Sequence, residues 1–114
     1  MSELLKKSHV NSSELEQLLK DRQEGKADFI LVDVREQMEY DMGHIKGVDM
    51  LKPTSTFQMW AHDFLDKYKD KNIIFTCRTA SRSASVQQVF QQNGMQNAIN
   101  HAGGIVTYRG EIER

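Results

Sequence analysis

Residues 73–83 read Ile-Ile-Phe-Thr-Cys-Arg-Thr-Ala-Ser-Arg-Ser and join a short apolar run to a polar loop that holds the only cysteine of the chain. The β-branched and aromatic residues Ile73 to Phe75 predict a buried strand, and Ala84 to Phe90 predict the helix that follows the loop. Parallel α/β sheets build their sites where a strand ends and a helix begins. We therefore expect a site at Cys77.

The composition of this loop is suited to a reactive thiol next to an anion. Its successive backbone N–H groups and the free N–H groups of the helix start would form a nest with positive partial charge. A thiol at the mouth of such a nest ionises more readily than an isolated one, and Arg78 and Arg82 add fixed positive charge. A lone cysteine is more often a small buried apolar residue, so the prediction that Cys77 is a nucleophile depends on the loop around it.

Length and composition exclude several classes of protein. A chain of 114 residues forms one domain, and its apolar and charged fractions, 39% and 27%, are those of an ordinary globular protein. The net charge of −1 gives no reason to expect nucleic acid or an anionic membrane as a partner. One cysteine provides no internal disulfide and no Cys-x-x-Cys pair, and the histidines are scattered, so we expect no metal and no cofactor.

The amino end carries no targeting signal that we can recognise. It has no apolar run like that of a signal peptide, and no stretch of the chain could cross a bilayer. If Met1 is the natural start, the protein is expected to be cytoplasmic, although a chain whose leader had been removed would look the same. The sequence does not distinguish a monomer from a homodimer.

Strand and helix signals alternate along the chain. Asn11 and Glu14 have the spacing of a capping box and predict a helix start. The nearly continuous apolar run over 29–34 predicts a strand covered on both faces, followed by a short helix over 35–42. The remaining predicted elements are a loop over 43–47, a brief strand over 48–51, an amphipathic helix from Phe57 to Leu65, a last strand over 97–100 and a short helix from 103 to 108. This alternation predicts an α/β fold.

Several segments together resemble the rhodanese-type sulfurtransferase domains. The segments are Leu31-Val32-Asp33-Val34-Arg35-Glu36 with Glu39-Tyr40, Gly43-His44-Ile45-Lys46-Gly47, the loop over 77–83, and Gly103-Gly104-Ile105 with Tyr108. They resemble two N-terminal signatures, the active-site loop and the closing segment of that family, in the family's order and spacing. The resemblance therefore predicts a single domain over 1–114 with a core over about 10–109.

The resemblance implies both a fold and a reaction. The fold is a small, twisted, mostly parallel sheet of about five strands with helices on both faces. In the reaction, the thiolate of Cys77 takes a sulfane sulfur from thiosulfate or a polysulfide, becomes a persulfide, and passes the sulfur to cyanide, a thiol or an acceptor protein. The donor-binding loop would consist of Arg78, Thr79, Ala80, Ser81, Arg82 and Ser83. Asp33 and Arg35 are expected to support this loop by hydrogen bonds or an ion pair.

One loop position departs from the family. Ala80 stands where the family commonly has glycine. If this position requires a positive φ, alanine imposes a strain of about 1–2 kcal/mol. Alternatively, the loop relaxes into a conformation that alanine adopts freely. The departure concerns donor preference and rate more than the fold.

Two other functions share parts of this pattern. Related phosphatases and arsenate reductases use a Cys-x5-Arg loop, whereas Arg82 gives Cys-x4-Arg here and Ser83 occupies the position that a phosphatase would need. No aspartate beside the loop suggests a general acid for an ester leaving group, so sulfur chemistry is favoured. A persulfide carrier for a partner protein would need the same cysteine and arginines, and the sequence leaves enzyme and carrier both open.

Overall fold

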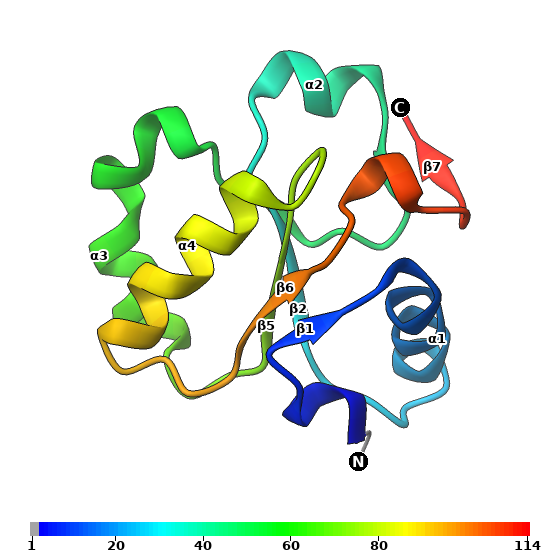
Figure 1. Ribbon diagram of the computed structural model, residues 1–114, viewed down its shortest axis with the longest axis horizontal. Helices are drawn as coiled ribbons and strands as arrows, with labels where there is room; N and C mark the ends of the chain where they lie inside the picture. Colours follow the sequence, from blue (N-terminus) through cyan, green and yellow to red (C-terminus); the bar gives the residue numbers. More distant parts are fainter. Residues whose placement is uncertain (1–2) are drawn as a thin grey trace.

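The computed structural model of the protein describes residues 3–114 and has a five-stranded parallel sheet at its centre (Figure 1). The strand order is β1 (His9–Val10), β6 (Ala98–His101), β5 (Ile73–Thr76), β2 (Ile30–Asp33) and β4 (Met50–Leu51), and every neighbouring pair is parallel. The predicted start at Met1 lies outside the described residues. The predicted α/β fold with about five mostly parallel strands is confirmed.

Helices cover both faces of the sheet. The α-helices are α1 (Ser12–Gln23), α2 (Gln37–Met42), α3 (Phe57–Tyr68) and α4 (Ser81–Gln92), with short 3-10 helices η1 (Glu3–Lys6), η2 (Thr54–Thr56) and η3 (Ile105–Thr107). Figure 1 shows α3 and α4 on one side of the strands and α1 on the other. None of the helices within residues 3–114 is long and apolar enough to cross a membrane.

Strand β5 contributes to two hydrophobic cores because successive side chains point to opposite faces of a sheet. Ile73 and Phe75 pack with the residues of α3 and α4, whereas Ile74 packs with those of α1. All of these side chains are fully buried. The uninterrupted apolar run that ends at the cysteine loop is therefore the run of a central strand that is covered on both faces.

The first helix begins as predicted. The N–H of Glu14 donates to the Asn11 side chain at 2.8 Å, and the N–H of Asn11 donates to the Glu14 carboxylate at 2.9 Å. This reciprocal pair is the predicted capping box, and it satisfies two backbone donors that the helix itself leaves free.

Three strands were not predicted. They are β1 and the antiparallel pair of β3 (His44–Ile45) with β7 (Ile112–Glu113), so the prediction of a continuous loop over 43–47 is wrong at two residues. Each of these strands has two residues, which is too few for a periodic pattern. The partner of β3 also lies far along the chain, where no local signal reports the pairing.

Several helix bounds also differ from the predictions. Helix α4 begins at Ser81 and not at Ala84, because the polar residues before Ala84 already form its first turn. Helix α2 begins at Gln37, because Glu36 is extended and caps it. The predicted last helix is only the 3-10 turn η3.

A chain of hydrogen bonds connects the end of β5 to η3 through His101. Thr107 Oγ1 donates its single proton to the carbonyl of Gly104 at 2.8 Å. In the hydrogen bond between Ser12 Oγ and Thr107 Oγ1, Ser12 is therefore the donor. Ser12 Oγ therefore accepts from His101 Nε2 at 2.7 Å, and His101 Nδ1 accepts from Thr76 Oγ1 at 2.8 Å. These contacts fix His101 as a neutral ring with its proton on Nε2.

We expect His101 to make the protein less stable at mildly acidic pH. Burial lowers the pKa of His101 to about 4, below the ordinary value of about 6.5. As the pH falls from about 6.5 to about 4, His101 takes up a proton in the unfolded chain before it does so in the folded one. The free energy of unfolding therefore decreases over this range and becomes constant below about pH 4. At about 1.4 kcal/mol per pKa unit the loss is at most about 3.5 kcal/mol.

Urea denaturation between pH 4 and 8 measures this effect. His101→Gln should flatten the pH dependence, while His9→Gln, at an exposed position, should leave it unchanged. A pH dependence that is the same in His101→Gln and in the natural sequence would contradict the assignment.

Candidate active site

Cys77 lies at the carboxyl end of β5, and residues 77–80 connect that strand to α4. In Figure 1 this connection lies between α2 and the segment that carries η3. Both neighbours touch it: Arg82 at the start of α4 contacts Glu39 of α2, and the N–H of Ile105 donates to the Cys77 carbonyl at 2.9 Å. The site is thus enclosed by segments that are distant in sequence.

The Cys77 sulfur is surrounded by donors from its own loop. Sγ accepts from the N–H of Ala80 at 3.1 Å and from the N–H of Ser83 at 3.4 Å, and it lies 3.3 Å from Ser83 Oγ. The Cys77 side chain is fully buried. Backbone N–H groups directed at the sulfur favour a negatively charged sulfur atom over a neutral one.

Ala80 adopts the left-handed conformation, with φ 82° and ψ −11°. It is the only residue other than glycine with a positive φ in the described part of the chain. Of the two alternatives, relaxation of the loop to suit alanine is therefore wrong, and the strain is present. In this conformation the N–H of Ala80 reaches Sγ, while its carbonyl accepts from the N–H of Ala84 at 2.9 Å and caps α4.

The Gly103-Gly104 turn packs directly against the cysteine loop. Gly104 has a φ of +70°, and a Cβ on it would lie 2.3 Å from the Arg78 carbonyl oxygen. That carbonyl also accepts from the N–H of Val106 at 3.1 Å. Only glycine permits this approach, which explains the glycine at position 104.

The two loop arginines have different surroundings. Arg82 makes a bidentate ion pair with Glu39, with distances of 2.7 and 2.9 Å. The hydrogen bond from Arg82 lowers the pKa of Glu39 to about 2, and Glu39 raises the pKa of Arg82. The Arg78 side chain is exposed and has no hydrogen-bond or ion-pair partner within residues 3–114. Arg78 is therefore the loop cation that remains available to an anion.

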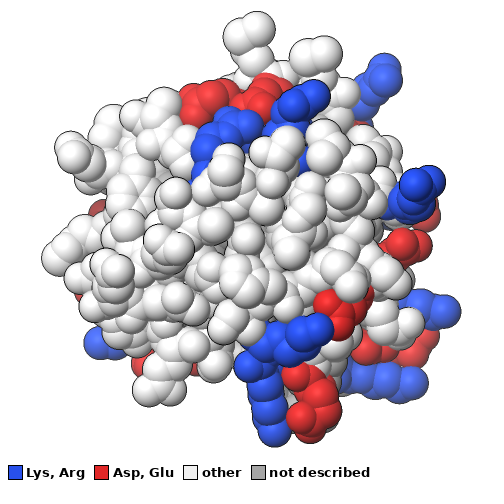
Figure 2. All heavy atoms as spheres, in the orientation of Figure 1, with Lys and Arg blue, Asp and Glu red and all other residues white. Residues whose placement is uncertain are grey.

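The other loop residues divide between rim and interior. Thr79 and Ser81 are exposed, and Ser83 is buried beside the sulfur. Figure 2 shows basic and acidic side chains lying next to each other on the face that it presents. Positive charge on that face is therefore confined to small areas. Of the three predicted hydroxyl groups, only that of Ser83 contacts Sγ.

Asp33 and Arg35 form the predicted ion pair. Arg35 donates to Asp33 Oδ2 at 2.8 Å and to the carbonyl of Gly43 at 2.7 Å, and both side chains are buried. The intervening Val34 donates its N–H to the Thr76 carbonyl, one residue before Cys77. The ion pair thus lies where the end of β2 is hydrogen-bonded to the end of β5.

The chain matches the family of the rhodanese-like domain over residues 14–111. It belongs to this family. Two solved structures extend the likeness to the fold. A rhodanese-related protein from Thermoplasma volcanium has a TM-score of 0.76 at 22% identity and covers 94% of this chain and 98% of its own. A rhodanese-like domain protein from Staphylococcus aureus has a TM-score of 0.73 at 28% identity, with 94% and 97% covered.

A curated relative is a much longer protein. The tRNA uridine(34) hydroxylase of Pectobacterium atrosepticum is 32% identical over 84 residues, which is 71% of this chain and 23% of the relative. The chain thus spans about a quarter of the length of the curated relatives that it matches. The similarity to these relatives concerns a rhodanese-like segment and not the whole hydroxylase.

Sequence reasoning missed two partners of the rhodanese-like loop. Asn100 on β6 accepts from the Ser83 hydroxyl at 2.6 Å, and Glu39 binds Arg82 as described above. Glu39 was part of a recognised motif, but nothing in the sequence paired it with Arg82. Asn100 was predicted only as a strand residue. Both contacts join residues that are far apart in the chain, where no spacing rule applies.

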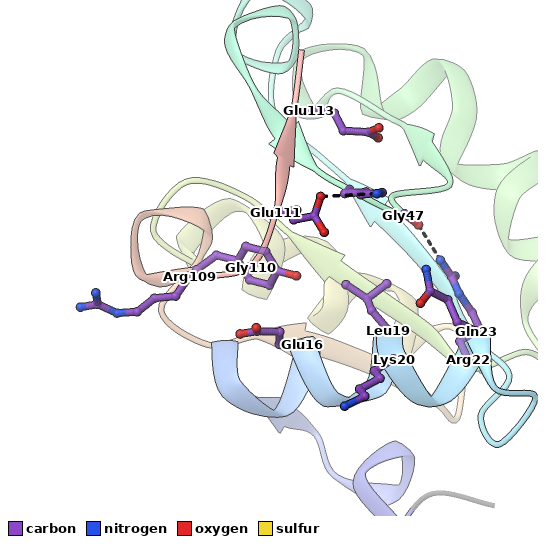
Figure 3. A pocket seen from close by; sticks show the side chains of 12 residues that line it. Glu16, Leu19, Lys20, Arg22, Gln23, Gly47, Arg109, Gly110, Glu111 and Glu113 are labelled. Carbon is purple, nitrogen blue, oxygen red and sulfur yellow. Dashed lines mark hydrogen bonds and ion pairs between the residues drawn. The ribbon is translucent and has the colours of Figure 1, made fainter.

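One cavity lies away from the loop. It has a volume of about 650 Å³ and lies between α1 and the pair of β3 and β7, with Glu16, Lys46, Tyr108 and Glu111 among its lining residues (Figure 3). None of residues 77–83 lines it. A smaller hollow of about 240 Å³ with a mostly apolar lining does include Arg82, together with Phe57 and Val89.

We expect Ala80→Gly to stabilise the protein. Glycine removes a strain of about 1–2 kcal/mol at this positive φ and adds about 0.5–1 kcal/mol of conformational entropy cost, so the free energy of unfolding should rise by about 0.5–1 kcal/mol. The matched control is Ala84→Gly, four residues on within α4, which should lower it by about 1 kcal/mol. Urea denaturation measures both. A loss of stability in Ala80→Gly would show that the loop is not strained.

Proposed function

We propose that this protein is a sulfurtransferase that moves a sulfane sulfur from thiosulfate or a polysulfide to a thiol or cyanide through a persulfide on Cys77. One observation carries the proposal. The Cys77 sulfur receives two backbone N–H groups from its own loop, while the guanidinium of the next residue, Arg78, is exposed and has no hydrogen-bond or ion-pair partner within residues 3–114. Membership of the rhodanese-like family supports the same chemistry.

In the first half-reaction the Cys77 thiolate attacks the outer sulfur of thiosulfate. A new sulfur–sulfur bond forms, the sulfur–sulfur bond of the donor breaks, and sulfite leaves with the electron pair. Arg78 is suited to the sulfoxy oxygens of the donor because its guanidinium presents a fork of N–H donors. The N–H groups of Ala80 and Ser83 stabilise negative charge on the Cys77 sulfur before the transfer, and afterwards the charge lies on the outer sulfur of the persulfide.

In the second half-reaction the acceptor attacks the outer sulfur of the persulfide. The bond between the two sulfurs breaks, and its electron pair returns to Cys77 as the thiolate. Cyanide would leave as thiocyanate, and a thiol would leave as a persulfide. Because the Cys77 side chain is buried, donor and acceptor would both reach it past the exposed rim residues Arg78, Thr79 and Ser81.

A persulfide carrier is the second candidate function. The observation that favours it is that the tRNA uridine(34) hydroxylases contain a similar segment as about a quarter of their length. A rhodanese-like unit can thus occur within a larger enzyme, where its cysteine would serve a reaction centre elsewhere. The carrier and the enzyme differ in whether free small acceptors complete the cycle.

Intact-protein mass spectrometry tests the first half-reaction. Incubation with thiosulfate, and separately with polysulfide, should add one sulfur atom to the natural sequence and none to Cys77→Ser. Cyanide should remove the added sulfur as thiocyanate. The absence of a mass gain with either donor would reject the proposal. Loading without turnover by cyanide or small thiols would identify the carrier.

Arg78→Ala should weaken the use of thiosulfate. Loss of charge-assisted hydrogen bonds worth about 1.5–3 kcal/mol lowers kcat/KM by about 10- to 100-fold, mainly through KM. Arg78→Lys should restore part of the activity, because a point charge replaces the fork. The matched control is the exposed Arg109, whose substitution by alanine should change nothing. Equal kcat/KM values in Arg78→Ala and the natural sequence would remove Arg78 from donor binding.

A further inference from the structure

The hydroxyl of Ser83 lies between three acceptors. Ser83 Oγ is 2.6 Å from Asn100 Oδ1, 3.1 Å from the Ala80 carbonyl oxygen and 3.3 Å from Cys77 Sγ. A hydroxyl has one proton and can donate to only one of them at a time. The contact with Asn100 is much the shortest, and both side chains are buried, so the proton points at Asn100.

This proton position has a consequence for the sulfur. With its proton directed at Asn100, Ser83 Oγ turns lone pairs toward Sγ, and it can accept a hydrogen bond from a Cys77 thiol. The same lone pairs would repel a thiolate. The thiolate is therefore better stabilised when the Ser83 hydroxyl turns from Asn100 to the sulfur, which leaves the buried Asn100 oxygen without that donor.

We propose that Asn100 is a positioning residue that controls the ionisation of Cys77 through Ser83. By holding the Ser83 proton it favours the thiol, and release of that proton to the sulfur stabilises the thiolate that attacks the donor. The thiol proton leaves to solvent, so the step needs no other reactant. The importance of this control for sulfur transfer rests on the proposed function, whereas the effect on the thiol itself does not.

Other charged or titratable groups lie around the loop, and the experiment has to separate their effects from that of Asn100. They are Arg78 and Arg82 on the loop and α4, Glu36 and Glu39 on α2, and Asp33, Arg35 and His101 at the strand ends. The Glu39 pKa of about 2 and the His101 pKa of about 4 place their titrations well below the range in which a thiol ionises. The charges of Glu39 and His101 are thus constant between about pH 6 and 10, the range of the measurement.

The thiolate can be observed directly because the chain has one cysteine. Thiolate ultraviolet absorbance is followed between about pH 6 and 10, and the curve of Cys77→Ser is subtracted to remove the tyrosines. In Asn100→Leu, where an apolar side chain of similar size replaces the amide, the midpoint should fall by about one pH unit, a tenfold gain in thiolate. Asn100→Val, which suits a strand, replaces it if Asn100→Leu does not fold.

Two controls make the result specific to the Ser83 proton. In a Ser83→Ala background, Asn100→Leu should no longer move the midpoint, because the hydroxyl that transmits the effect is gone. Gln87→Met removes another buried amide from the interface of α4 and β6, where it donates to the Ala98 carbonyl, and it should leave the midpoint unchanged. An unchanged or raised midpoint in Asn100→Leu, an equal shift without Ser83, or an equal shift in Gln87→Met would each overturn the proposal.

Sulfur loading of the same variants separates this inference from the proposed function. A lowered midpoint with no loading from thiosulfate or polysulfide would reject the sulfurtransferase and keep the role of Asn100 in ionisation. Sulfur loading with an unchanged midpoint would keep the sulfurtransferase and reject the role of Asn100 in ionisation. If both proposals hold, Asn100→Leu should load sulfur faster than the natural sequence at a pH below the midpoint of the natural sequence. At a pH well above that midpoint the two should load sulfur at the same rate.

Discussion

The chain has to turn from the buried end of β5 into the first turn of α4 within residues 77–80, and the site depends on this constraint. So short a connection brings the N–H groups of Ala80 and Ser83 onto the sulfur of Cys77. It also requires the positive φ of Ala80 and leaves no space for a side chain at Gly104, which lies against the loop backbone. The strain at Ala80 is thus part of the geometry that surrounds the sulfur.

Fixed charge around the loop is divided between two tasks. Arg82 is held by Glu39 in a bidentate pair that fastens α4 to α2, so part of its charge is compensated inside the protein. Arg78 keeps its charge for solvent or a ligand. The closest groups that can stabilise the sulfur are therefore backbone N–H groups, whereas the Arg78 cation is exposed to solvent.

The parts of the structure that sequence could predict are those with a local signal. The run from Ile73 to Phe75 is continuous and apolar, and the capping box of Asn11 and Glu14 is a pattern of four residues. Strands of two residues have no period, and β3 pairs with β7 only because the fold brings them together. The same limit applies to the site. The loop residues could be named from their order in the sequence, but Glu39 and Asn100 contact loop or helix residues that lie 43 and 17 positions away from them.

The last two residues of β6 anchor the two sides of the cysteine loop because strand side chains alternate between faces. Asn100 reaches the α4 side and binds Ser83, whereas His101 reaches the α1 side and binds Thr76 and Ser12. Through Ser12 and Thr107, His101 is also connected to the Gly104 carbonyl, and so to the turn that closes the site. A buried polar group is costly unless it is hydrogen-bonded, so these side chains fix the loop in one position relative to the sheet. The thiol is placed by this polar pair as much as by the apolar strand that leads to it.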